Sequence, residues 1–180
     1  MIINKEVINS YNINGVIVLR NVISENWLKK LQRGIKKNFD NPSKYKCVYE
    51  ESNGKELFYD DYCNWNRIEE YKDFLFNSKL ANIASQLMKS KKINIFHEHV
   101  LIKEAGAEKK TPWHQDQSYY CVEGKQTISF WCPLDKVNKN SSPEFICKSH
   151  TWTNKFLPTK FFGDSYKHID KDFEKIPDIE

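Results

Sequence analysis

The segment from Ile93 to Lys103 is the longest strand-like stretch of the chain, because its residues follow a period of two. Alternate side chains of a strand point to opposite faces of a sheet. One face of this strand carries Ile93, Ile95, His97, His99, Leu101 and Lys103, and the other carries Asn94, Phe96, Glu98, Val100, Ile102 and Glu104. Directly before this stretch, in residues 79–88, the apolar residues recur at helical spacing instead. Helices followed by strands indicate an α+β fold.

Short helices and strands are expected along the rest of the chain. Ser24 is placed to cap a helix whose apolar residues recur at helical spacing up to about Phe39. A Ser-Asn-Gly turn at 52–54 separates two short strands and indicates a hairpin. Ser78 is the expected cap of a later helix. The expected helices are 4–12, 24–39, 67–76 and 79–88, and the expected strands are 16–19, 47–49, 57–59, 93–103, 126–133 and 144–148.

Length and composition indicate a single soluble domain. A chain of 180 residues has a prior of about one domain, and its 39% of hydrophobic residues are enough for a sizeable core. The net charge of +4 comes from Lys and acidic residues that are interspersed along the chain. Because no basic stripe with interleaved aromatic residues occurs, we expect no nucleic-acid partner.

Cysteine usage and the apolar segments indicate the compartment. The five Cys are odd in number and widely spaced, with no C-x-x-C pair, which argues against a disulfide framework and against a zinc site. The N-terminus lacks the apolar core of a signal peptide. No stretch is apolar over the length that is needed to cross a bilayer. These features predict a cytoplasmic protein without a membrane partner.

A His and an Asp separated by one residue stand in the stretch from Thr111 to Asp116. On an extended backbone, residues i and i+2 point to the same side, so His114 and Asp116 can bind one ion together. An imidazole and a carboxylate are two of the three ligands of the two-His-one-carboxylate site that holds non-haem Fe(II). A bare H-x-D triplet is more often a surface turn. Here the strand patterns on both sides favour the metal, so we predict His114 and Asp116 as catalytic metal ligands.

The motifs around this triplet occur in an order that resembles a known family. The strand that ends at Lys103 is followed by Trp113-His114-Gln115-Asp116, then by Ser129-Phe130-Trp131-Cys132-Pro133-Leu134-Asp135, and then by Glu144-Phe145-Ile146-Cys147-Lys148-Ser149-His150. With the N-terminal helices and the strand at 16–19, this order is similar to the phytanoyl-CoA dioxygenase family of Fe(II)/2-oxoglutarate-dependent oxygenases. The resemblance covers most of the chain and does not indicate the substrate.

The resemblance implies a double-stranded β-helix, which is a cupin-like jelly roll, flanked by N-terminal helices. Residues 1–180 would form one oxygenase domain. Within it, residues 1–90 would be a helical and mixed cover, and residues 91–180 would be the first part of the jelly-roll core.

The resemblance also implies the cofactors and the residues around them. It implies Fe(II) on His114 and Asp116, with 2-oxoglutarate as the co-substrate. It places Lys103, Gln115 and Trp131 around that co-substrate. In a regular strand Gln115 would point away from both ligands, so its role depends on its family position alone.

Two residues of the family pattern are not found before Glu180. One is the third metal ligand, a His on a later strand, and the other is an Arg that pairs with the distal carboxylate of 2-oxoglutarate. His168 is the only His after the Ser149-His150 turn, and we expect it in a solvated loop. The sequence therefore predicts an N-terminal portion of an oxygenase, with a later segment or a second chain completing the barrel.

The expected function is an Fe(II)/2-oxoglutarate-dependent dioxygenase that hydroxylates a small organic or acyl substrate. The first alternative is a catalytically inactive jelly-roll fragment that binds a partner through an open sheet edge. The second is a cupin-like protein that binds another ion. His97 and His99 share a strand face with Lys103, and they either contact the substrate or are satisfied polar residues near the barrel mouth.

Overall fold

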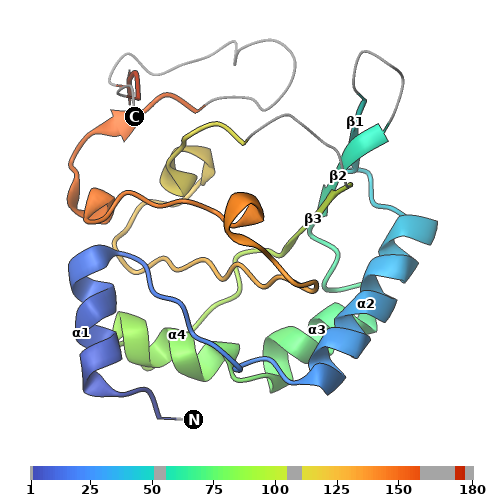
Figure 1. The fold of residues 1–180 in the computed structure, drawn as a ribbon, viewed down its shortest axis with the longest axis horizontal. Helices are drawn as coiled ribbons and strands as arrows, with labels where there is room; N and C mark the ends of the chain where they lie inside the picture. The colour runs from blue at the N-terminus through green and yellow to red at the C-terminus, as the bar shows by residue number, and fades with distance from the viewer. Residues whose placement is uncertain (1, 51–55, 105–110, 159–172, 177–180) are drawn as a thin grey trace.

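The structure is a computed structural model that describes residues 2–50, 56–104, 111–158 and 173–176. Its helices are α1 (Lys5–Asn14), α2 (Glu25–Asp40), α3 (Glu69–Asn77) and α4 (Leu80–Met88), with 3-10 turns η1 (Asp116–Tyr119), η2 (Lys139–Ser141) and η3 (Ser149–Thr151). Its strands are β1 (Cys47–Glu50), β2 (Glu56–Tyr62), β3 (His99–Lys103), β4 (Lys155–Phe156) and β5 (Phe173–Glu174). Figure 1 shows α1, α4, α3 and α2 along the lower and right sides of the view, with β1–β3 above α2 and α3.

Capping residues set the ends of the first two helices. The side chain of Asn4 accepts a backbone N–H of α1, and Ser24 Oγ accepts the N–H of Trp27 at 3.4 Å, so each satisfies a donor of a first turn. Gly15 ends α1 in the left-handed conformation with φ 81°, and its N–H donates to Tyr11 O. A residue without Cβ adopts that conformation readily. The predicted helices at 4–12 and 24–39 are confirmed.

The next two helices confirm the predictions at 67–76 and 79–88, apart from their junction. Ser78, the predicted cap of the second helix, is the C-cap of α3, and α4 begins after Lys79. Ser78 Oγ accepts the N–H of Leu80 at 3.3 Å, so the hydroxyl still satisfies a donor in the first turn of α4. The N-cap of α4 is thus Lys79, one residue after the predicted Ser78.

The strands β1, β2 and β3 form an antiparallel sheet in that order. The pairing of β1 with β2 confirms the predicted hairpin, whose turn at 52–54 lies outside the described residues. Tyr59 stands opposite Val48 and Ile102 in the register. This face packs against α2 and α3 in a cluster of Leu31, Tyr59, Ile68, Tyr71, Phe74 and Val100. The opposite face carries Phe58, Asp60, Tyr62, His99, Leu101 and Lys103.

A fully buried carboxylate joins the sheet to α2. Asp61 of β2 and Asn38 of α2 are both 0% exposed, and Asn38 Nδ2 donates to Asp61 Oδ2 at 2.8 Å. Ser43 donates to the same carboxylate through its N–H and through its hydroxyl, and the N–H of Tyr62 donates to Oδ1 at 2.9 Å. Burial disfavours the charge of Asp61, but these hydrogen bonds outweigh it and lower the pKa to about 2.

A second apolar cluster lies between α1 and α4. Ile3, Ile83 and Leu87 are its buried members. Ile17 and Leu19, which follow α1, pack against this cluster, and so does Ile128 from the later part of the chain. These contacts fix the positions of two segments that were expected to be strands.

The expected strands at 16–19, 93–98, 126–133 and 144–148 are wrong for the described residues, because these segments have no ladder partner there. In the described residues the sheets are the three-stranded β1–β3 and the two-stranded β4–β5, and a double-stranded β-helix is not shown. The coarse expectation of mixed helices and strands is confirmed. A strand requires main-chain hydrogen bonds to a neighbour, whereas Ile17, Leu19 and Ile128 are held by side-chain packing.

No helix within the described ranges is long and apolar enough to cross a membrane.

Candidate metal centre

His114 and Asp116 come together at the start of η1. Gln115 between them is extended, with φ −101° and ψ 128°, so the two side chains point to the same side as an i, i+2 pair should. Nε2 of His114 lies 3.3 Å from Oδ1 of Asp116. Figure 1 shows this stretch in yellow, between the three-stranded sheet and the β4–β5 pair in that view. The i, i+2 spacing thus brings two potential metal-donor atoms close together.

The other nitrogen of the His114 ring is already engaged. Nδ1 lies 2.8 Å from the carbonyl oxygen of Pro112, and a carbonyl can only accept, so Nδ1 carries a proton and donates it. In the neutral ring the lone pair is then on Nε2, which faces Asp116. Two acceptor atoms at 3.3 Å need a positive charge beside them, either a proton on Nε2 or a metal ion. A His that donates its second nitrogen to a carbonyl is also the usual arrangement of a metal ligand.

The second oxygen of Asp116 is held by two hydroxyl groups. Ser129 Oγ donates to Oδ2 at 3.0 Å, and the hydroxyl of Tyr120 donates to the same atom at 3.4 Å. Oδ1 is the atom that faces His114. The carboxylate therefore has one oxygen bonded to the protein and the other directed at the imidazole.

The electrostatics of the pair favour its charged form, with a protonated imidazole beside an ionised carboxylate. The hydrogen bond that the protonated His114 ring donates to Asp116 raises the pKa of His114, although burial opposes the charged ring. The same contact lowers the pKa of Asp116 against its burial, and Ser129 adds to the effect. The side chain of His114 is 26% exposed and that of Asp116 is 52% exposed, so an ion can reach the pair from solvent.

Among the described residues no group of three His, Cys, Asp or Glu side chains converges to hold a metal. The described residues thus bring together two potential donor atoms, those of His114 and Asp116, and their role as metal ligands stays a prediction. His168, expected in a solvated loop, lies outside the described residues.

The three residues expected around the co-substrate lie in different surroundings. Gln115 uses its amide on the main chain of the β4 region, since Nε2 donates to Asn154 O at 3.2 Å and Oε1 accepts the N–H of Phe156 at 3.1 Å. Lys103 is the last residue of β3 and is exposed. Trp131 is 50% exposed, two residues after Ser129. Their roles toward a co-substrate stay predictions.

His99 is the first residue of β3, and His97 precedes the strand and contacts a neighbour of the candidate pair. The ring of His97 packs edge-on against Tyr120 at 6.0 Å between centroids, and Tyr120 in turn bonds to Asp116. Burial, with His99 nearby, lowers the pKa of His97 against the attraction of Asp116. His99 Nε2 lies 3.8 Å from Asp60 Oδ1. These contacts do not decide between the two predictions for the imidazoles, which were contact with a substrate and a satisfied polar position near the barrel mouth.

Sequence reasoning did not assign Ser129, Tyr120 or the carbonyl of Pro112 to the metal site. A weak signal was available for Ser129, because it is polar within a stretch that has Phe130 and Trp131 beside it. No local pattern could show that the carbonyl of Pro112 contacts the imidazole, since that contact depends on the backbone conformation of residues 112–114.

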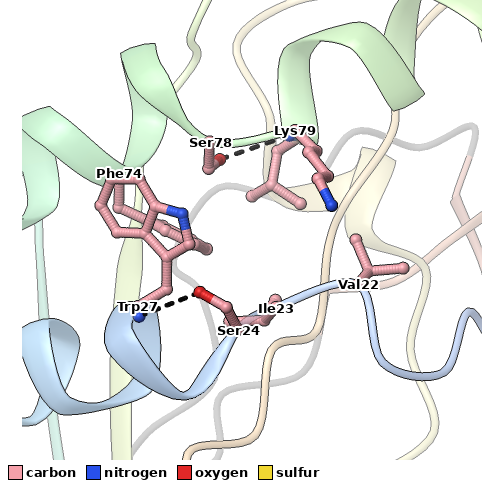
Figure 2. A pocket seen from close by; sticks show the side chains of 8 residues that line it. Val22, Ile23, Ser24, Trp27, Phe74, Ser78 and Lys79 are labelled. Atoms are coloured by element: carbon pink, nitrogen blue, oxygen red, sulfur yellow. Dashed lines mark hydrogen bonds between the residues drawn. The ribbon is translucent and has the colours of Figure 1, made fainter. Parts of the chain in front are cut away.

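A small cavity of about 70 Å³ lies elsewhere, between the start of α2 and the junction of α3 with α4. Figure 2 shows Trp27 and Phe74 on one side of it and Val22, Ser24 and Lys79 around the remainder. Trp27 and Phe74 pack edge-on at 5.4 Å, and Ser24 Oγ accepts the N–H of Trp27. Its lining residues are helix caps and core residues, and none belongs to the candidate metal centre.

The family comparison covers nearly the whole chain. A family model described as Phytanoyl-CoA dioxygenase (PhyH) matches residues 11–178. No curated protein and no solved structure matches the chain.

Proposed function

Because the chain belongs to the phytanoyl-CoA dioxygenase family, we propose that it is an Fe(II)/2-oxoglutarate-dependent dioxygenase acting on a small organic or acyl substrate. Membership supports an oxygenase-type enzyme with a cupin-like family fold, and members generally use Fe(II) and 2-oxoglutarate. The observation that carries the proposal is the convergence of His114 Nε2 and Asp116 Oδ1 at 3.3 Å within the matched residues.

The donor pair fits an iron ion in chemistry and in spacing. Imidazole and carboxylate are two members of the facial triad of non-haem Fe(II). Two ligands that each lie about 2.1 Å from one ion, at the right angle of an octahedron, are about 3 Å apart. The observed separation of 3.3 Å is close to that value. The proton on Nδ1, fixed by Pro112 O, leaves Nε2 available for the ion.

When bound, the iron and 2-oxoglutarate would supply the oxidising chemistry, in which one atom of O2 enters a C–H bond of the substrate and the other enters succinate as 2-oxoglutarate loses carbon dioxide. The chain's own residues hold the reactants. His114 and Asp116 would bind the ion through one atom each. Ser129 and Tyr120 satisfy the other carboxylate oxygen. Lys103, Gln115 and Trp131 are proposed around the co-substrate by family position.

The test is iron-dependent turnover of 2-oxoglutarate. Purified protein is incubated with Fe(II), a reductant, oxygen and 2-oxoglutarate, and succinate is measured against a sample that lacks iron. We expect succinate from the wild type and none above background from His114→Ala. Asp135→Ala, which removes an exposed carboxylate at the end of the stretch that begins at Ser129, is the matched control and should retain turnover. Absence of iron-dependent succinate from the wild type would refute the proposal.

A further inference from the structure

Three oxygen atoms form a closed hydrogen-bonded triangle beside the candidate ligands. Ser129 Oγ lies 3.0 Å from Asp116 Oδ2, the hydroxyl of Tyr120 lies 3.4 Å from the same oxygen, and the two hydroxyls lie 3.2 Å apart. The residues come from separate places in the chain, because Tyr120 follows η1 and Ser129 lies in the segment that returns past α4. The triangle therefore joins two segments at the carboxylate.

The donor count determines the direction of these hydrogen bonds. An ionised carboxylate can only accept, and each hydroxyl has one proton to donate. Ser129 therefore donates to Oδ2 at the shorter distance, and Tyr120 donates either to Oδ2 or to Ser129 Oγ. In both cases the chain of donors ends on Oδ2 of Asp116. Hydrogen bonds to a charged acceptor are roughly twice as strong as neutral ones.

The position of Tyr120 is itself set by packing. Its ring contacts Phe96 edge-on at 5.0 Å and His97 at 6.0 Å. Those two residues lead into β3, so the phenol is fixed relative to the sheet. Asp116 is 52% exposed, so packing alone does not fix its carboxylate. Beside the contact of Oδ1 with His114, the two hydroxyls are thus the described contacts that hold Oδ2.

We propose that Ser129 and Tyr120 are positioning residues that occupy Oδ2 of Asp116, so that Asp116 binds the ion through Oδ1 alone. This inference rests on the proposed function. A carboxylate that binds through one oxygen uses one coordination position, and a facial triad needs its remaining positions open for oxygen and the co-substrate. Loss of the two hydroxyls would let Oδ2 rotate toward the ion and take a second position, or let the carboxylate turn away from His114.

The alternative is that the two hydroxyls have a structural role alone, in which they hold the segment around Ser129 against η1. The two roles differ in what they predict for bound metal. If the role is structural alone, loss of the hydroxyls changes the stability of the fold and leaves the coordination of a bound ion unchanged. A positioning role changes the affinity and the coordination of the ion, because outer hydrogen bonds to a ligand typically contribute 10- to 100-fold in metal affinity.

The experiment titrates Co(II) alone into the wild type and into Ser129→Ala, Tyr120→Phe and the double variant. The dissociation constant and the visible absorption of bound Co(II), which reports coordination number, are both measured. We expect the affinity to fall about 10-fold in Ser129→Ala and about 100-fold in the double variant, with a changed spectrum. Ser129→Thr keeps a hydroxyl and should restore both readouts.

Ser118→Ala is the matched control. It removes a hydroxyl from η1 that donates to Phe156 O at 2.7 Å rather than to Asp116. It therefore tests the loss of a structural hydrogen bond that does not contact a candidate ligand. It should leave the Co(II) affinity and spectrum unchanged. Unchanged affinity and spectrum in the double variant would overturn the positioning role while leaving the proposed function intact. A wild type that binds no Co(II) would instead count against the metal site itself, and with it the proposed function.

Discussion

The buried carboxylate of Asp61 allows a quantitative prediction about stability. Asp61 is 0% exposed and accepts hydrogen bonds from Asn38, from the N–H and hydroxyl of Ser43, and from the N–H of Tyr62. Replacement by Asn keeps the shape but presents an amide group to donors that need acceptors. We expect Asp61→Asn to destabilise the fold near neutral pH by about 2–4 kcal/mol, because buried donors lose a charged partner.

The pH dependence follows from the lowered pKa. The pKa of Asp61 falls from 3.8 to about 2 on folding. At 1.36 kcal/mol for each unit of pKa difference, the shift corresponds to about 2 kcal/mol of unfolding free energy. Because the folded pKa is below the unfolded one, this stabilisation is fully present above about pH 5. It is lost as the pH falls through about 2.

The assay is urea unfolding at a series of pH values between 6 and 2. The wild type should lose about 2 kcal/mol more of its unfolding free energy over this range than Asp61→Asn, whose amide does not titrate. Asp40→Asn removes an exposed carboxylate at the end of α2 that pairs with Lys36, and it should change stability by less than about 0.5 kcal/mol. Parallel pH profiles for the wild type and Asp61→Asn would refute the reasoning.

Two glycines give further predictions. Gly15→Ala should lower the unfolding free energy in urea by about 1–2 kcal/mol, because its φ is 81° and a Cβ would overlap the His150 ring. Adding His150→Ala should recover only the part of this loss that is due to the overlap. Gly34→Ala should also destabilise, by about 1–3 kcal/mol in the same assay, because a Cβ would press on the Tyr71 ring. In an open helix the same change would stabilise by about 1 kcal/mol, so a stabilised Gly34→Ala would show that α2 and α3 are not packed as described.

The helices could be predicted from sequence because their signals are local. Ser24 caps α2 three residues ahead of its partner N–H, and Gly15 ends α1 through its own backbone freedom. The hairpin of β1 and β2 was equally accessible, since its two strands flank the Ser-Asn-Gly sequence at 52–54. In each case the residues that determine the element lie within a few positions of it.

The strands after Lys92 could be predicted only in part. From His99 to Lys103 the two faces separate as expected, with Val100 buried and Leu101 50% exposed, because β2 lies beside them as a partner. The residues from Ile93 to Glu98 show the same period without a ladder in the described residues. A period of two reports which side chains share a face, but pairing depends on distant segments that the local pattern does not contain.

The candidate site shows the same division. The convergence of His114 and Asp116 follows from one extended residue between them, which the sequence spacing predicted. The roles of Ser129 and Tyr120 depend on how the later segment returns to η1, a long-range arrangement without a local signal. Whether Gln115 contacts a co-substrate stays a prediction, and its amide bonds to the backbone of the β4 region.

The most direct measurement is a crystal structure of the protein grown with Fe(II) without oxygen, with anomalous scattering recorded at the iron edge. The account predicts an iron peak within coordination distance of both Nε2 of His114 and Oδ1 of Asp116, and loss of that peak in His114→Ala. An iron-loaded protein whose peak lies elsewhere, for example beside His99 and Asp60, or a wild type that takes up no iron, would contradict it.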